Sequence, residues 1–133
     1  MNILTREATS KTPLVYLSAD EGRFEIKGRS IPGDAEDFWR PVLDWFEGYS
    51  KNPISITEVK IDLEYFNISS SKRLLFLLYK LNEIAESGKE VKIKWYYRED
   101  DEDMFEVGQD YAFMVKVPFE FITYDKDAEL VAL

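Results

Sequence analysis

Residues 54–81, ISITEVKIDLEYFNISSSKRLLFLLYKL, pass from a strand pattern directly into a helix pattern. In the first half, apolar residues alternate with charged ones, which is typical of a strand with one buried face; the apolar set is Val59, Ile61, Leu63 and Tyr65. After the serines, apolar residues recur at helical spacing, at Leu74, Leu77, Leu78, Leu81 and Ile84. We expect a strand over 54–65 and a helix from Ser70 to about Glu86, ended by Gly88.

Asn67 and a run of serines, Ser69, Ser70 and Ser71, lie between this strand and this helix. The first N–H groups of a helix have no partner within it, and the helix dipole is positive there. A phosphate group can sit or be attached at such a place. The same residues also fit a plainer role, in which one serine caps the helix and the others are solvated.

The remaining pattern predicts further strands and helices on both sides of this unit. Strands over 13–17 and 23–27 flank a turn at 19–22 and predict a β-hairpin. A helix follows Asp34, and Pro41 lies inside it, so we expect a kink there or a short turn before the main helix. A strand over 90–97, a helix over 103–115 and a last strand over 119–124 complete the prediction.

Charged residues on one face of each strand decide the architecture. Sheets covered by helices on both faces have strands that read as continuous apolar runs, and these strands do not. We therefore expect a two-layer α/β domain: a mixed sheet with an N-terminal hairpin, and helices packed on one face. Residues 54–97 should form a right-handed crossover between parallel strands. Asp62 and Glu64 are expected to pair with Lys92 and Lys94 across neighbouring strands.

Composition limits the domain count and the possible function. The chain has 133 residues, 45% of them hydrophobic, which suits one domain with a packed core. We assign residues 1–12 to a flexible N-terminus, 13–124 to a single domain and 125–133 to a tail. The formal net charge of −9 argues against binding nucleic acid or an anionic membrane surface.

The chain contains no histidine and no cysteine. This excludes disulfides, thiolate catalysis, Ser-His-Asp constellations and zinc sites built from His or Cys. The N-terminus has no apolar signal-peptide core, and the longest apolar run, 74–79, is too short to span a bilayer. We expect a cytoplasmic protein that does not insert into membranes.

Two other groups of residues are candidate sites. Asp103, Glu106 and Asp110 share one helical face and invite a divalent metal, although the spacing is not that of an EF-hand, and acidic residues near a helix start also suit a solvated helix. Arg29, in the loop 28–33, is a candidate to contact an acidic partner or a phosphate. It equally suits an ion pair with a local carboxylate.

Several motifs, taken in order, resemble the SiaC family of bacterial regulatory phosphoproteins over residues 28 to 121. They are Gly28-Arg29-Ser30-x-Pro32, Pro41-Val42-Leu43-Asp44-Trp45, Tyr65-Phe66-Asn67-x-Ser69-Ser70-Ser71-Lys72-x-Leu74-Leu75, Trp95-Tyr96-Tyr97, Asp101-Glu102-Asp103-Met104 with Glu106, Gly108 and Asp110, and Pro118-Phe119-Glu120. The resemblance implies a fold similar to STAS domains and a function without catalysis or cofactor.

The resemblance also implies a partner-switching system. A serine/threonine kinase would phosphorylate the strand-to-helix turn, and a PPM-type phosphatase would remove the phosphate. The unphosphorylated form would bind and activate a diguanylate cyclase, raising cyclic di-GMP and favouring biofilm formation. Partner contacts are expected at Arg29, Asn67, Ile68, Ser71 and Lys72.

The sequence departs from the family at the residue that matters most. The family pattern is Asn-Thr-Ser-Ser with the threonine as phosphate acceptor, and here that position is Ile68. We expect the acceptor to be Ser69, with Ser70 as the second candidate. A structural adaptor that is not regulated by phosphorylation, a protein serving a different partner, and a small acid-metal enzyme using Asp103, Glu106 and Asp110 remain as alternatives.

Overall fold

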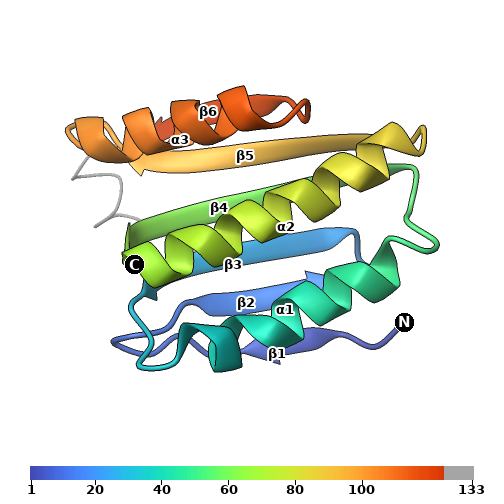
Figure 1. The fold of residues 1–133 in the computed structure, drawn as a ribbon, viewed down its shortest axis with the longest axis horizontal. Coiled ribbons are helices and arrows are strands. Elements are labelled where there is room, and N and C mark those ends of the chain that lie inside the picture. Colours follow the sequence, from blue (N-terminus) through green and yellow to red (C-terminus); the bar gives the residue numbers. More distant parts are fainter. Residues whose placement is uncertain (125–133) are drawn as a thin grey trace.

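The computed structural model describes residues 1–124, which form a six-stranded sheet and three helices (Figure 1). The strands lie in sequence order across the sheet. They are β1 (Leu4–Arg6), β2 (Leu14–Ser18), β3 (Arg23–Ser30), β4 (Ile56–Phe66), β5 (Glu90–Arg98) and β6 (Phe119–Tyr124), and the helices are α1 (Ala35–Tyr49), α2 (Ile68–Glu86) and α3 (Glu102–Met114).

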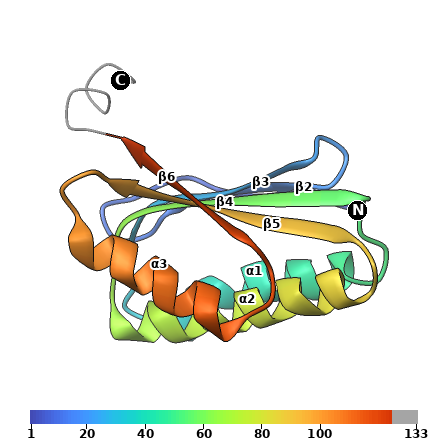
Figure 2. The same ribbon diagram turned by 90° about the horizontal axis from the view of Figure 1, so that it is seen from above.

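The sheet is mixed, and the three helices cover one face of it (Figure 2). β1, β2 and β3 pair antiparallel, whereas β3, β4, β5 and β6 pair parallel. Each parallel pair is joined by one helix. Right-handed crossovers that always step in the same direction place every helix on the same face. The predicted two-layer mixed sheet with an N-terminal hairpin is confirmed.

The core lies between the helices and the inner face of the sheet. Its largest fully buried side chains include Trp39, Tyr49 and Phe46 of α1, Phe24 of β3 and Trp95 of β5. Phe24 packs with its ring centroid 5.2 Å from that of Tyr49. Tyr49 donates or accepts a hydrogen bond of 2.7 Å with the buried hydroxyl of Thr57. The aromatic residues therefore form the core that holds α1 against the sheet.

The structure adds a strand that the sequence did not predict and changes the bounds of several others, including β3, which extends to Ser30 and takes Arg29 out of the predicted loop. β1 lies within residues 1–12, where no strand was expected, and Trp45 Nε1 donates to the Asn2 carbonyl at 2.8 Å. α1 runs as one helix through Pro41, so no separate turn precedes it. α2 begins at Ile68 rather than Ser70. The predicted tail, 125–133, lies outside the described residues.

A bulge late in β4 turns one predicted core residue outward. Gly28 of β3 pairs with Leu63, but Arg29 pairs with Tyr65, so Glu64 is the extra residue. After a bulge the alternation of faces shifts by one residue. Tyr65 is therefore 52% exposed, and Phe66 takes the inner position, with its ring 6.4 Å from that of Trp95. The expectation that Tyr65 faces the core was wrong.

The charge pairs on the open face of the sheet differ from those expected. Lys92 pairs with Glu120 at 2.6 Å, and Lys94 lies 3.7 Å from Glu58. The register explains the difference, because β4 pairs with β5 only from Ile56 to Ile61. Asp62 and Glu64 lie beyond that stretch, and Asp62 instead accepts a hydrogen bond from the Tyr124 hydroxyl at 3.0 Å.

Gly108 lets α3 approach the sheet closely, and this generates a test. A Cβ atom at this position would lie 2.5 Å from Trp95 Nε1 and 2.8 Å from Phe121 Cε1. We expect Gly108→Ala to lower the free energy of unfolding by about 1–3 kcal/mol, despite the better helix propensity of alanine. Urea denaturation measures this change.

Gly33→Ala is the matched control, because nothing lies within 4 Å of the added methyl group. It should change the free energy of unfolding by less than about 0.5 kcal/mol. Equal stabilities of the two variants would contradict the close approach of α3 to Trp95.

Candidate functional site

The carboxyl ends of the parallel strands lead into the N-termini of all three helices at one edge of the sheet (Figure 1). Each helix is capped by an acidic or amide side chain that accepts from the N–H three residues later. The distances are 3.0 Å for Asp34, 2.9 Å for Asn67 and 3.0 Å for Asp101. Ligands of open α/β sheets commonly bind at this edge, so it is the natural place for a site.

The N-terminus of α2 differs from the other two in charge. The first turn of α1 contains Glu36 and Asp37, and that of α3 contains Glu102 and Asp103, whereas the first turn of α2 contains no acidic residue. Acidic side chains offset the positive end of a helix dipole. The start of α2 is therefore left electropositive in a chain whose net charge is −9.

A buried hydrogen-bond network fixes this end of α2 to β3 and α1. The Ser30 and Ser70 hydroxyls are 2.8 Å apart, and both residues are fully buried. Ser70 Oγ donates to the Ser30 carbonyl at 3.0 Å, and Trp39 Nε1 donates to Ser30 Oγ at 3.2 Å. A serine hydroxyl has one proton. Ser30 must therefore donate to Ser70, which gives a continuous chain from Trp39 through both serines to the Ser30 carbonyl.

This network fixes the positions of Asn67, which caps α2, and of Ser70, which is buried against β3. Asn67 caps α2, and its backbone N–H donates to the Ser30 carbonyl at 3.1 Å. Ser70 lies 0% exposed with its proton already donated, so its hydroxyl is not open to a kinase in this conformation. The physical reason is that α2 begins two residues earlier than expected, which places Ser70 in its first turn, facing the sheet.

Ser71 is half-buried, and its hydroxyl group forms a hydrogen bond within α2. Its hydroxyl donates to the Ile68 carbonyl at 2.7 Å. Its own carbonyl accepts a hydrogen bond of 2.8 Å from the Tyr111 hydroxyl of α3. Burial raises the pKa of Tyr111 to about 12. Ser71 therefore links α2 to α3.

Ile68 and Ser69 are the residues that the turn presents to solvent. Ile68 is 89% exposed, and Ser69 is also exposed. Within residues 1–124 the Ser69 hydroxyl makes no hydrogen bond. Arg29 is exposed on β3, opposite Tyr65. Lys72 is exposed, with its ammonium 5.9 Å from the ring centroid of Phe76.

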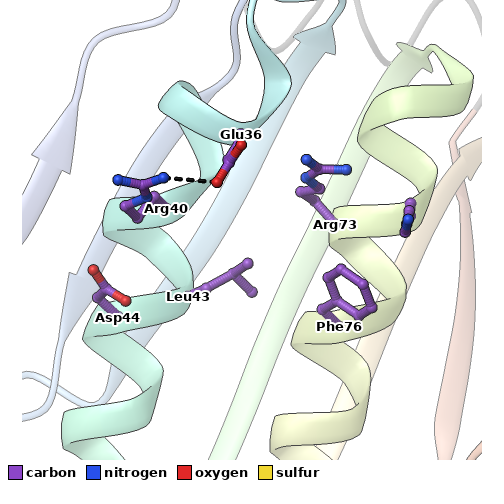
Figure 3. A pocket seen from close by; sticks show the side chains of 7 residues that line it. Glu36, Arg40, Leu43, Asp44, Arg73 and Phe76 are labelled. Atoms are coloured by element: carbon purple, nitrogen blue, oxygen red, sulfur yellow. Dashed lines mark hydrogen bonds and ion pairs between the residues drawn. The ribbon is translucent and has the colours of Figure 1, made fainter.

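A pocket of about 240 Å³ lies between α1 and α2, one turn beyond Ser69. Figure 3 shows Leu43 of α1 and Arg73 of α2 pointing toward the space between the helices, with Phe76 below Arg73. Arg40 is held by Glu36 through an ion pair of 2.6 Å. The other residues that line the pocket are Asp44 and Lys72.

Three residues of this region were not singled out from the sequence. Ser30 was noted only as part of a motif, and its burial depends on the fold. Arg73 and Phe76 line the pocket with Lys72. The spacing of Arg73, four residues after Ser69, was the available signal, because residues four apart share a helix face.

The acidic residues of α3 do not come together as a metal site. Asp103, Glu106 and Asp110 are all exposed. Within residues 1–124, no group of three or more acidic side chains is arranged to hold a metal ion. In the same part of the chain, no helix is long and apolar enough to cross a membrane.

Comparison with known proteins identifies the family. A family model described as SiaC family regulatory phosphoprotein matches residues 6–124. The chain belongs to the SiaC family of regulatory phosphoproteins. An uncharacterized protein of Pseudomonas aeruginosa strain UCBPP-PA14, PA14_02130, is 26% identical over 126 residues, which are 95% of this chain and 100% of that protein.

Solved structures of SiaC share the fold. Apo-SiaC from P. aeruginosa is 26% identical and superposes with a TM-score of 0.84, over 92% of this chain and 99% of that chain. A chain in the crystal structure of the diguanylate cyclase SiaD in complex with its activator SiaC, from the same organism, is 26% identical with a TM-score of 0.86, over 91% of this chain and 99% of that chain. These structures confirm the resemblance to the SiaC family and the mixed α/β fold.

The two neighbouring serines of this SiaC-family chain provide a test of the buried network. Ser70→Ala removes the acceptor of the buried Ser30 hydroxyl proton and one of the two donors to the Ser30 carbonyl, which keeps the Asn67 N–H. We expect it to lower the free energy of unfolding by about 1–3 kcal/mol in urea denaturation. Ser69→Ala, at an exposed position, should change it by less than about 0.5 kcal/mol. Similar losses from both variants would refute the assignment of Ser70 to the interior.

Tyr111→Phe tests the contact between α3 and Ser71 through its pH dependence. Below pH 10, the ordinary pKa of tyrosine, the variant should be less stable by about 0.5–1.5 kcal/mol because the hydrogen bond is lost. The raised pKa of about 12 means that the unfolded chain ionises first, so the wild type loses stability between pH 10 and 12. Stability curves of the two proteins should therefore converge above pH 10 and then cross, because the loss from ionisation exceeds the contribution of the hydrogen bond. A constant difference would contradict the burial of this hydroxyl.

Proposed function

We propose that this chain is a non-catalytic regulator that binds a diguanylate cyclase when unphosphorylated and is released by phosphorylation of Ser69. A serine/threonine kinase would add the phosphate and a PPM-type phosphatase would remove it, both acting in the cytoplasm. The observation that carries the proposal is the exposed Ser69 beside the exposed Ile68, at the electropositive start of α2. The complex of SiaC with SiaD in P. aeruginosa supports the choice of partner.

Accessibility separates the three serines as phosphate acceptors. A kinase must reach the hydroxyl and remove its proton. Ser70 is buried and Ser71 donates back to its own helix, whereas Ser69 is exposed and makes no hydrogen bond within residues 1–124. Because Ile68 stands where the family has its acceptor threonine, this difference in accessibility favours Ser69, one residue further along the helix, as the phosphate acceptor.

A phosphate on Ser69 would alter the surface without disturbing the fold. It adds about −1.5 to −2 charges at neutral pH. Negative charge is stabilising at a helix N-terminus, and the first turn of α2 carries none of its own. The effect on a partner is opposite, because a partner that packs against Ile68 would meet a hydrated dianion next to an apolar contact.

Phosphate mapping tests the acceptor. The chain is incubated with ATP and each candidate serine/threonine kinase of the organism that encodes it, and the product is analysed by mass spectrometry. We expect phosphate on Ser69, with none on Ser70. Phosphate confined to Ser70 or Ser71, or the absence of any phosphate on this turn, would contradict the proposal.

Binding to the diguanylate cyclases of the same organism tests the switch. We expect the unmodified chain to bind one of them and Ser69→Asp to weaken that complex by roughly tenfold or more, a loss of about 1.4 kcal/mol. Ser55→Asp is the matched control, because Ser55 is exposed before β4 at the opposite edge of the sheet. An equal loss of affinity in both variants would show that the added net charge, and not its position at Ser69, weakens the complex. That result would contradict the proposed switch.

One specific observation keeps a second candidate function in view. Ile68 replaces the family's acceptor threonine, so the chain also fits an adaptor that binds its partner without regulation by phosphate. That function predicts a cyclase complex whose affinity is the same for wild type and Ser69→Asp.

A further inference from the structure

The pocket between α1 and α2 has the size and lining of a site for side chains of another protein. Its volume of about 240 Å³ is below the range of roughly 300–1,000 Å³ that is usual for small-molecule sites. Leu43 and Phe76 supply its apolar surface, and Phe76 is 42% exposed. An apolar pocket of this size suits one anchoring side chain of a partner.

Two cations at one side of the pocket are left without acidic partners. In the described part of the chain, neither Lys72 nor Arg73 makes an ion pair. The acidic residues lining the pocket are Glu36, which holds Arg40, and the exposed Asp44 of α1. By contrast, Lys80, two turns further along α2, pairs with both Glu47 and Glu83.

Lys72 and Arg73 stand out because they line a pocket with an apolar surface, in a chain with a net charge of −9. Acidic groups of the same chain outnumber basic ones, 26 to 17, yet within residues 1–124 none compensates this pair. Such an arrangement is complementary to a partner segment that carries a carboxylate next to an apolar side chain.

The same cations are within reach of a phosphate on Ser69. Lys72 and Arg73 follow Ser69 by three and four residues, so they are its neighbours on the surface of α2. Side chains on a helix lean toward its N-terminus, which directs the long side chain of Arg73 back toward Ser69. Arginine pairs with phosphate through two parallel hydrogen bonds.

We propose that the α1–α2 pocket is the docking site for an acidic partner segment, with an apolar side chain against Leu43 and Phe76 and a carboxylate at Arg73 and Lys72. Phosphate on Ser69 forms ion pairs with these two cations and so competes with the partner's carboxylate for them. The inference rests on the proposed function, since it assumes phosphorylation at Ser69 and binding of the unphosphorylated chain.

Competition for the same cations explains release without a change of fold. Ser70 and its network remain buried beneath the phosphorylated turn, so α2 keeps its position. The partner loses its ion pair and meets an added dianion at the same place. Regulation then depends on Arg73 as well as on Ser69.

Phosphorus NMR tests the pairing without any partner. Phosphoserine is placed at position 69 by genetic encoding, and its second pKa, about 6 for a free phosphoserine, is titrated. The chain has no histidine, so no histidine side chain titrates near the phosphate and alters its pKa. We expect Arg73→Gln to raise the second pKa of the phosphate by roughly 0.5. Lys89→Gln, an exposed cation beyond the other end of α2, is the matched control and should leave it unchanged.

Equal phosphate pKa values in the wild type, Arg73→Gln and Lys89→Gln would overturn the pairing. Circular dichroism melting of each variant checks that the substitutions at Arg73 and Lys89 leave the fold intact. This experiment does not depend on whether a natural kinase or cyclase has been found.

Binding to the cyclase tests the docking site. Where the unmodified chain binds, Arg73→Gln should weaken the complex roughly tenfold, and Lys89→Gln should not. Adding Ser69→Asp to Arg73→Gln should cost less affinity than adding it to the wild type, because the two changes act on one contact. Unchanged affinity of Arg73→Gln, or strictly additive effects, would overturn the docking site while leaving the proposed function intact. Absence of any cyclase complex would instead refute the proposed function, and the phosphate titration would still decide the pairing.

Discussion

The hydrogen bond between the buried hydroxyls of Ser30 and Ser70 is the constraint on which the functional end of the molecule depends. It joins the end of β3 to the first turn of α2, and Trp39 extends it into α1. Within residues 1–124, no buried side-chain nitrogen or oxygen lacks a partner. Moving α2 would leave several of these groups unpaired in the interior, at a cost of about 1–3 kcal/mol each. The turn is therefore held in one position.

This fixed turn determines how the proposed phosphorylation of Ser69 would act. The network holds Ser70 inward, so Ile68 and Ser69 must face solvent. Aspartate and glutamate side chains occupy the first turns of α1 and α3, but the first turn of α2 is left without them. A phosphate there is stabilised by the helix dipole and by nearby cations. The energy of the proposed switch therefore lies in competition at the surface rather than in refolding.

Much of the fold could be predicted from alternation and helical spacing, because those patterns report burial directly. β1 could not, since three residues are too few to show a period. The bulge at Glu64 could not either, because it arises from pairing with β3 and not from local sequence. For the site, the serine run and the family motifs singled out the turn between β4 and α2, where the structure places the N-terminus of α2. Which serine is buried depends on the contact with Ser30, forty residues away in the chain, and the sequence carries no local signal for it.

Amide hydrogen exchange on the chain with encoded phosphoserine at position 69 tests the central claim most directly. The claim is that phosphate changes the surface of a turn that stays in place. It predicts that the Ser70 amide, bonded to Asn67, and the amides of the buried face of α2 keep the protection that they have in the unmodified chain. Loss of protection at Ser70 and along the first turns of α2 would show that phosphorylation unfolds the N-terminal part of the helix. That result would contradict the claim.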